Sequence, residues 1–230
     1  IRTISALILA PVTLWILIQG GVFFYILMGV VAGISLSEWL GLSKKLERPD
    51  NWFFGICGAF YICFCLVAFL KLSPYMNIAV LVGVWISDIG AYLVGKKFGR
   101  WRVVPSISPN KTLTGFIGAC LVPGFIFMFA SFAYQGYFGV QALDFCSYVP
   151  FSFGEAGQRF NPFEMFSPVV FFVLFCFTGL AGQAGDLLIS AMKRRAGAKD
   201  TGDLIPGHGG LLDRIDAILL ASLLFYIMLV

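Results

Sequence analysis

Charged residues are scarce in this sequence, at 12% of 230 positions, while hydrophobic residues make up 59%. This balance lies outside the range of soluble globular domains and indicates a polytopic membrane protein. Histidine occurs once and no Cys-x-x-Cys pair is present, so the six cysteines are expected to be small apolar residues and not zinc ligands. The sequence also lacks linkers, internal repeats and low-complexity tracts, which favours a single domain over residues 1–230.

Seven apolar stretches approach the roughly 20 residues that a transmembrane helix needs. They are Ile4–Ile18, Gly21–Leu40, Trp52–Leu70, Tyr75–Val94, Thr112–Tyr134, Phe166–Ile189 and Ile215–Val230. The first is interpreted as a retained helix, because no small-residue cleavage site of a signal peptide follows it. The sequence therefore predicts an all-α, polytopic membrane protein with about seven spans.

Lysine and arginine gather on one side of this arrangement. The N-terminus and the loops after the second, fourth and sixth spans hold 14 of the 16 Lys and Arg residues, all except Lys71 and Arg159. By the positive-inside rule these loops face the cytoplasm. The net charge of +4 is then explained by topology and phosphate chemistry, and no nucleic-acid partner is expected. The segment Gln135–Met165 is expected to be an extracytoplasmic loop.

The most polar part of the chain, residues 190–216, lies between two apolar stretches. Four of its cations can hold phosphate oxygens, namely Lys193, Arg194, Lys199 and Arg214. Three of its four aspartates, Asp200, Asp213 and Asp216, are considered as hard oxygen donors of the kind that Mg²⁺ prefers. Gly209 and Gly210 follow His208 and leave backbone N–H groups open to an anion. The combination predicts a metal–polyphosphate site at cytoplasmic loops and helix ends.

Two aspartates inside expected spans, Asp88 and Asp186, need an explanation. A charge at the bilayer centre costs roughly 2.5–3.5 kcal/mol and is usually paired or faces a polar cavity. Asp186 and Ser190 share a helix face that leads into the polar segment; the alternative for either aspartate is an interhelical salt bridge with a loop arginine. Lys111 lies in Ser108–Thr112, which is expected to open the fifth helix, and a helix start beside a lysine is a ready anion site.

These residues resemble the signature of the phosphatidate cytidylyltransferases, also called CDP-diacylglycerol synthases. The matching positions are Ser190, Lys193-Arg194, Lys199-Asp200, Gly202, Ile205-Pro206, His208-Gly209-Gly210, Asp213-Arg214 and Asp216. Upstream similarity covers Gly185-Asp186-Leu187, the spacing Trp85/Asp88/Ala91-Tyr92/Gly95, and Ser108-Pro109-x-Lys111-Thr112-x2-Gly115. The chain departs from the family in the long Gln135–Met165 segment, in Ala217 where serine is common, and in a last helix without proline.

The resemblance implies an Mg²⁺-dependent nucleotidyltransferase of the cell inner (plasma) membrane that converts CTP and phosphatidate to CDP-diacylglycerol and pyrophosphate. Asp186 and Asp213 would be the metal ligands, for two divalent ions, with Asp216 in support. Lys193 and Arg214 would act in catalysis, and a homodimer is left open. The other residues expected to bind substrate are Lys111, Ser190, Arg194, Lys199, Asp200, Gly209 and Gly210. His208 is expected to hydrogen bond to a phosphate or an aspartate, with general-acid catalysis of pyrophosphate departure as the alternative.

Two rival functions come from other classes. A CTP-dependent lipid kinase would need a base for a hydroxyl group, for which Asp88 is the candidate. A transporter would use Asp88 and Asp186 as ion sites, but it predicts paired inverted repeats and broken helices, and the sequence has neither.

Overall fold

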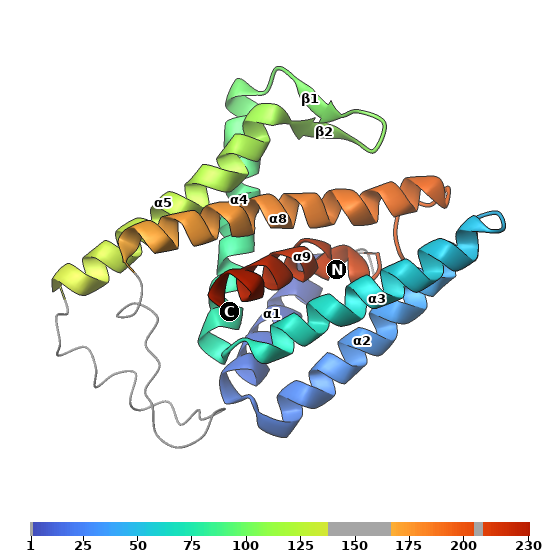
Figure 1. The fold of residues 1–230 in the computed structure, drawn as a ribbon, viewed down its shortest axis with the longest axis horizontal. Helices are drawn as coiled ribbons and strands as arrows, with labels where there is room; N and C mark the ends of the chain where they lie inside the picture. The colour runs from blue at the N-terminus through green and yellow to red at the C-terminus, as the bar shows by residue number, and fades with distance from the viewer. Residues whose placement is uncertain (1, 138–166, 205–208) are drawn as a thin grey trace.

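The computed structural model describes residues 2–137, 167–204 and 209–230. These residues form seven helices and a two-stranded hairpin (Figure 1). The elements are α1 (Arg2–Gln19), α2 (Gly21–Ser43), α3 (Asp50–Lys71), α4 (Pro74–Phe98), β1 (Arg102–Val104), β2 (Ser108–Thr112), α5 (Leu113–Tyr137), α8 (Pro168–Arg195) and α9 (Leu212–Leu229). Each helix overlaps one expected span, so the helical architecture is confirmed. Most of Gln135–Met165 and all of His208 lie outside the described residues.

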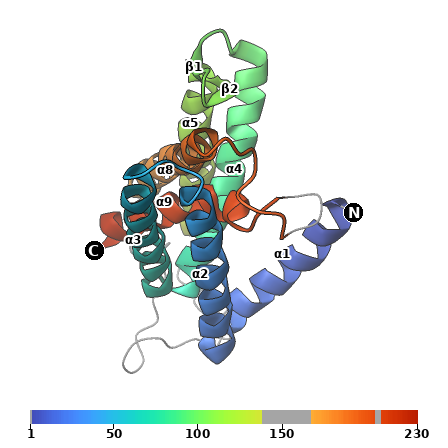
Figure 2. The same cartoon turned by 90° about the vertical axis from the view of Figure 1, so that its right-hand side faces the viewer.

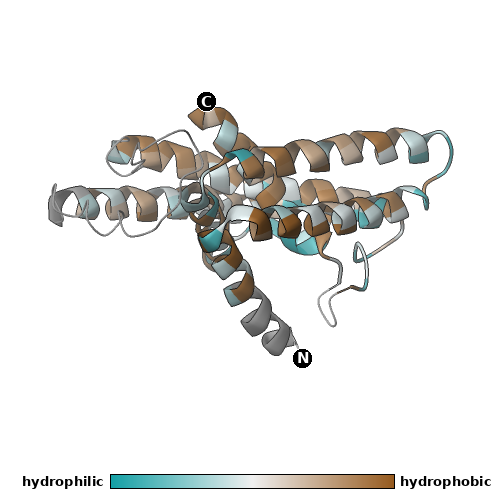
Figure 3. Ribbon diagram, turned by 90° about the horizontal axis from the view of Figure 1, so that it is seen from below, coloured by the Kyte–Doolittle hydropathy of each residue, from teal (hydrophilic) through white to brown (hydrophobic). Residues whose placement is uncertain are grey.

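Five helices, namely α2, α3, α4, α5 and α8, are long and apolar enough to cross a membrane. The other two, α1 and α9, have 18 residues each. Large apolar side chains such as Phe60, Phe64 and Phe132 are exposed on the outside of the helices, and Figure 3 shows hydrophobic colour along most of the helical length. Water would disfavour such a surface, whereas lipid covers it readily. The protein is a polytopic membrane protein.

Local sequence explains where two of the long helices begin. Ser73 and Ser167 each precede a proline at the first helical position and accept a hydrogen bond from the backbone N–H three residues later. Serine caps the helix, and proline fits the first position because its missing N–H would have no partner there. At the other end of α8, Lys193, Arg194 and Arg195 occupy the last turn, where cations favour the helix dipole.

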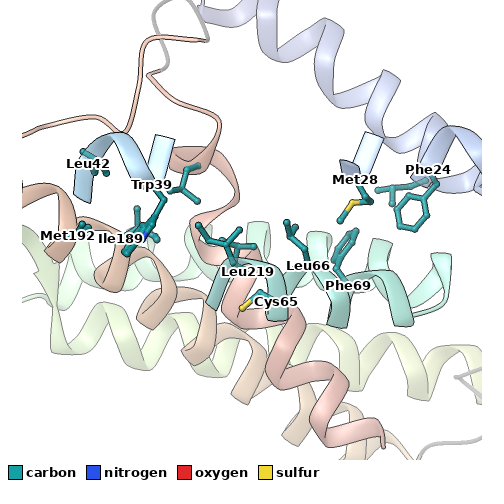
Figure 4. Packing of buried hydrophobic residues seen from close by; sticks show 13 residues of the cluster. Phe24, Met28, Trp39, Leu42, Cys65, Leu66, Phe69, Ile189, Met192 and Leu219 are labelled. Atoms are coloured by element: carbon teal, nitrogen blue, oxygen red, sulfur yellow. The ribbon is translucent and has the colours of Figure 1, made fainter. Parts of the chain in front are cut away.

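The helices pack around two apolar clusters that meet along α8 and α9. In one cluster the ring of Phe175 on α8 stacks on Phe127 of α5 and meets Phe225 of α9 edge-on. In the other, Trp39 of α2 packs beside Ile189 of α8 (Figure 4). The Trp39 indole N–H also donates to the carbonyl of Phe54 on α3 at 2.9 Å. These contacts hold α2 against α3 and against the C-terminal half of α8.

The hairpin corrects one expectation from the sequence. Ser108–Thr112 was expected to open the fifth helix, but it forms β2 and pairs antiparallel with β1. The helix α5 begins at Leu113, and the Thr112 hydroxyl oxygen accepts from the Gly115 N–H at 3.2 Å. Lys111 therefore lies on a strand of the hairpin. The hairpin is beside the C-terminal end of α4 and the start of α5 (Figures 1 and 2).

The C-terminal end of α8 contacts the hairpin and the start of α3, which adjoin loops rich in lysine and arginine. Arg194 Nε donates to the carbonyl of Ile107 in the hairpin at 3.4 Å. The Arg195 guanidinium lies 4.9 Å from the ring centroid of Phe54, near the start of α3. Connections that the charge pattern assigns to one side of the membrane are thus brought together around one helix end.

Candidate active site

One face of α8 carries three of the expected site residues. Asp186, Ser190 and Lys193 follow one another at helical spacing. The Ser190 hydroxyl donates to Asp186 Oδ1 at 3.2 Å. The face therefore runs from a carboxylate, through a hydroxyl group, to an ammonium group at the helix end.

Asp186 is paired with Lys111 of the hairpin. Lys111 Nζ lies 2.6 Å from Asp186 Oδ2 and donates to the Gln183 carbonyl at 3.2 Å. Gln183 is buried, and its side-chain amide donates to Asp88 Oδ1 at 2.9 Å. Asp186 thus forms an ion pair, with a lysine of the hairpin in place of a loop arginine. The sequence reasoning missed Gln183, although a polar residue one turn before Asp186 in an apolar span was a usable signal.

Asp213, in the first turn of α9, is paired with Lys193 in the same way. Lys193 Nζ lies 2.6 Å from Asp213 Oδ1. The other oxygen, Oδ2, accepts from the Thr201 N–H at 2.8 Å, the Thr201 hydroxyl at 3.0 Å and the Gly210 N–H at 3.1 Å. Burial alone would raise the pKa of Asp213, but the bonds from Lys193 and from these backbone N–H groups outweigh it, so the pKa lies below its ordinary value. Asp213 is held as a carboxylate.

Asp216 lies one turn after Asp213 and is buried. Its Oδ1 accepts from the Ala217 N–H at 2.8 Å, and its side chain interacts directly with that of Asp186. The close contact depends on Gly185, because a Cβ atom there would lie 2.5 Å from the carbonyl oxygen of Asp216. Gly185 lets α8 and α9 approach so that their aspartates meet.

Gly185→Ala should therefore push α8 and α9 apart. Overpacking of this kind costs about 1–3 kcal/mol, and here it would also separate Asp186 from Asp216. We expect a lower melting temperature in detergent and reduced activity. Gly41→Ala on α2 is the matched control, since a Cβ there meets nothing within 4 Å. If Gly185→Ala melts and turns over like the control, the close helix contact is not needed.

The glycine loop before α9 donates to the protein's own carboxylates. Gly209 adopts a φ of 82°, as expected for a glycine that allows a left-handed turn. The N–H groups of Leu211 and Leu212 donate to Glu38 at 2.9 Å each. Glu38, on α2, was not predicted to be part of the site. The signal for it was a carboxylate near the end of the apolar stretch Gly21–Leu40.

The structure brings together some expected residues and leaves others at the edge. Those that converge are Lys111, Asp186, Ser190, Lys193, Gly209, Gly210, Asp213 and Asp216. Those on exposed positions of the same segment are Arg194, Lys199, Asp200 and Arg214. His208 is outside the described residues, so its expected role stays a prediction.

The donor set fits Mg²⁺ in one particular way. Among the described residues, no three His, Cys, Asp or Glu side chains form a group that could hold a metal alone. Mg²⁺ is commonly bound by one or two carboxylates, with water and substrate phosphates completing its shell. Asp186 and Asp213, each with a single lysine as its cationic partner, suit that arrangement.

A model of the cytidylyltransferase family matches residues 50–230, which include all of these residues except Glu38. The chain belongs to this family.

Similar proteins extend the match along the chain. A phosphatidate cytidylyltransferase of Rickettsia bellii is 32% identical over 233 residues, covering 99% of this chain and 89% of the relative. One of Bacillus subtilis is 32% identical over 213 residues, covering 88% and 67% respectively. One of Staphylococcus aureus is 38% identical over 157 residues, covering 68% and 49%. The family resemblance noted from the signature residues is confirmed.

Proposed function

We propose that this chain transfers the cytidylyl group of CTP to phosphatidate, giving CDP-diacylglycerol and pyrophosphate. Support comes from the family match and from relatives named for this activity along nearly the whole chain. The structural observation that carries the proposal is the pair of lysine-bound aspartates, Asp186 and Asp213, on adjoining helices. Two such pairs where α8 and α9 pack together suit a reaction between two phosphorylated substrates.

The chemistry needs positioning more than a protein nucleophile. The phosphate of phosphatidate is already ionised, so its oxygen can attack the α-phosphorus of CTP directly. A bond forms between that oxygen and the α-phosphorus, while the bond from the α-phosphorus to the pyrophosphate oxygen breaks. The protein must align the two substrates and neutralise charge on the leaving group.

Asp186 and Asp213 are the residues that would hold Mg²⁺, with two ions expected and Asp216 supporting the first carboxylate. When bound, Mg²⁺ would neutralise charge on the triphosphate and on the departing pyrophosphate. The ammonium groups of Lys111 and Lys193 lie 2.6 Å from these carboxylates, so they would be beside the substrate phosphates that bound Mg²⁺ carries.

The exposed residues around this centre would bind the rest of the substrates. Arg194, Lys199 and Arg214 can hold phosphate oxygens, and Arg is suited to bidentate contacts. Ser190, next to Asp186, offers a hydroxyl group, and Asp200 lies close to Gly209 in the loop. His208 would hydrogen bond to a phosphate or an aspartate from the same loop.

The decisive experiment for this function is product analysis with labelled CTP and the purified full chain in phosphatidate-containing micelles. Label at the α-phosphorus should move into lipid. Transfer of γ-label would instead identify a CTP-dependent lipid kinase. If neither label moved into lipid, the result would favour the transporter hypothesis. Asp88, the kinase's candidate base, accepts a hydrogen bond from Gln183 at Oδ1, which leaves Oδ2 as the oxygen that could accept a proton, so the labelling result decides between the two reactions.

The orientation is also a proposal: the site faces the cytoplasm from the cell inner (plasma) membrane. Its support is the charge pattern and the contacts that join the basic connections at the end of α8. A single catalytic domain over residues 1–230 is supported by the contributions of α2, the hairpin, α8 and α9 to one site. A homodimer stays a prediction.

Cysteines introduced at Lys111 and Lys199 should test the orientation. Both should react with an impermeant thiol reagent only after the membrane is opened, because both belong to the cation-rich side. A cysteine at Arg159, on the opposite side in the predicted topology, should react in intact cells. Labelling of position 111 or 199 from outside would contradict the proposed arrangement.

A further inference from the structure

Glu38 of α2 contacts the loop of the candidate site at several points. Its Oε1 accepts from the Leu211 N–H at 2.9 Å. Its Oε2 accepts from the Leu212 N–H and from the Thr201 hydroxyl, each at 2.9 Å. We propose that Glu38 is a positioning residue that holds this loop and, through Thr201, sets the orientation of Asp213. The inference rests on the proposed function for its catalytic consequence.

The first part of the argument concerns the start of α9. The first N–H groups of a helix have no partner inside the helix, and a negative charge there is favourable. The residue before α9, Leu211, provides no side-chain cap of its own. Glu38 supplies the missing acceptor from another helix, and it binds the two N–H groups just before Asp213. The carboxylate therefore determines where the first turn of α9, and with it Asp213, is held.

Thr201 provides the second connection. Its buried hydroxyl lies between Glu38 Oε2 at 2.9 Å and Asp213 Oδ2 at 3.0 Å. One hydroxyl proton serves one acceptor at a time, so the Thr201 N–H, which donates to Asp213 Oδ2, keeps the residue attached when the hydroxyl turns to Glu38. Movement of Glu38 would therefore be transmitted to Asp213, a proposed Mg²⁺ ligand, through Thr201 as well as through the first turn of α9.

The space around Glu38 is closed on the loop side. A Cβ atom on Gly210 would collide with the side chains of Thr201 and Glu38, and one on Gly202 would lie 3.0 Å from Glu38 Oε1. Trp39, the next residue of α2, is buried, and its indole N–H is hydrogen-bonded to a backbone carbonyl of α3. The backbone of α2 beside Glu38 is therefore fixed by Trp39, and the loop packs closely around the Glu38 carboxylate. It lies before residue 50, where the family match begins.

Glu38→Gln is the test variant. The amide keeps one acceptor oxygen but turns the other into an N–H₂ group, which would face an N–H donor or the Thr201 hydroxyl. We expect kcat to fall about tenfold and the Mg²⁺ concentration for half-maximal rate to rise, as for loss of a hydrogen bond to a charged group. The KM for phosphatidate should change little. Glu38→Asp, which keeps the charge, should recover part of the loss. Glu47→Gln, exposed in the loop after α2, is the control and should match wild type.

Hydrogen exchange gives a readout that does not depend on catalysis. In Glu38→Gln the amides of Leu211 and Leu212 should exchange faster, while those of α4 and α5 stay protected. Unchanged exchange at these amides, or an unchanged Mg²⁺ dependence in an active enzyme, would overturn the proposal. A general loss of protection and melting temperature in both Glu38 variants would assign Glu38 to stability alone, which also overturns it. If wild type transfers no cytidylyl group, the proposed function fails, and exchange still decides whether Glu38 holds the loop.

Discussion

Asp213→Asn should reduce cytidylyl transfer by about a hundredfold or more, and Asp186→Asn should do the same. A charged metal ligand is worth several kcal/mol in the transition state, and each 1.36 kcal/mol is a factor of ten in rate. The asparagine at 213 keeps an oxygen that can accept from the N–H groups of Thr201 and Gly210, so the loop has a way to stay in place. The rate should be measured against Mg²⁺ concentration in detergent.

Folding must be followed in the same variants, because each change leaves a lysine without its carboxylate. Lys193 has only 12% of its side chain exposed, and removing one partner of a buried pair can cost about 3–5 kcal/mol of stability. Membrane insertion and melting temperature separate this loss from the catalytic one. Asp203→Asn, on an exposed aspartate of the same loop, is the matched control. A turnover of a tenth of wild type or more in either variant, with Mg²⁺ still required, would rule out that ligand.

The helices could be predicted from the sequence because a membrane span is a local property. About 20 apolar residues suffice to identify one, and Ser-Pro starts and terminal lysines mark its ends. The beginning of α5 was harder to predict. Ser108–Thr112 has the residues of a helix cap, yet it forms a strand because Arg102–Val104 is available to pair with it. Such a pairing depends on a partner elsewhere in the chain, which the cap residues do not reveal.

The candidate site was likewise predictable only in part. The residues of the α8 face and of the first turn of α9 follow from helical spacing and from the signature. Their partners do not, because Lys111 reaches Asp186 from a hairpin, and Glu38 reaches the loop from a helix far earlier in the chain. A single carboxylate near a basic turn usually lies at a helix end and is exposed to water. Only the packing of α2 against the loop distinguishes Glu38 from that ordinary case.

Lys111→Ala should raise the KM for phosphatidate more than the KM for CTP. Lys111 lies in the hairpin that leads directly into α5, where a membrane span is expected to meet the lipid headgroups. Its ammonium group lies 2.6 Å from Asp186 Oδ2, and 16% of its side chain is exposed. The loss should be on the order of 1.5–3 kcal/mol, the range for a charged hydrogen bond, or about tenfold to a hundredfold. Initial rates should be measured while each substrate is varied at saturating concentrations of the other.

Lys97→Ala is the matched control for this prediction, since Lys97 is an exposed cation in the last turn of α4. This variant should change neither KM by more than about twofold. Lys111→Arg keeps the positive charge and should recover part of the phosphatidate KM. A larger effect on the KM for CTP would instead assign Lys111 to the triphosphate. If Lys111→Ala behaves like the control, its contact with Asp186 serves only to neutralise an aspartate near the membrane, and the lipid phosphate must be bound by other cations.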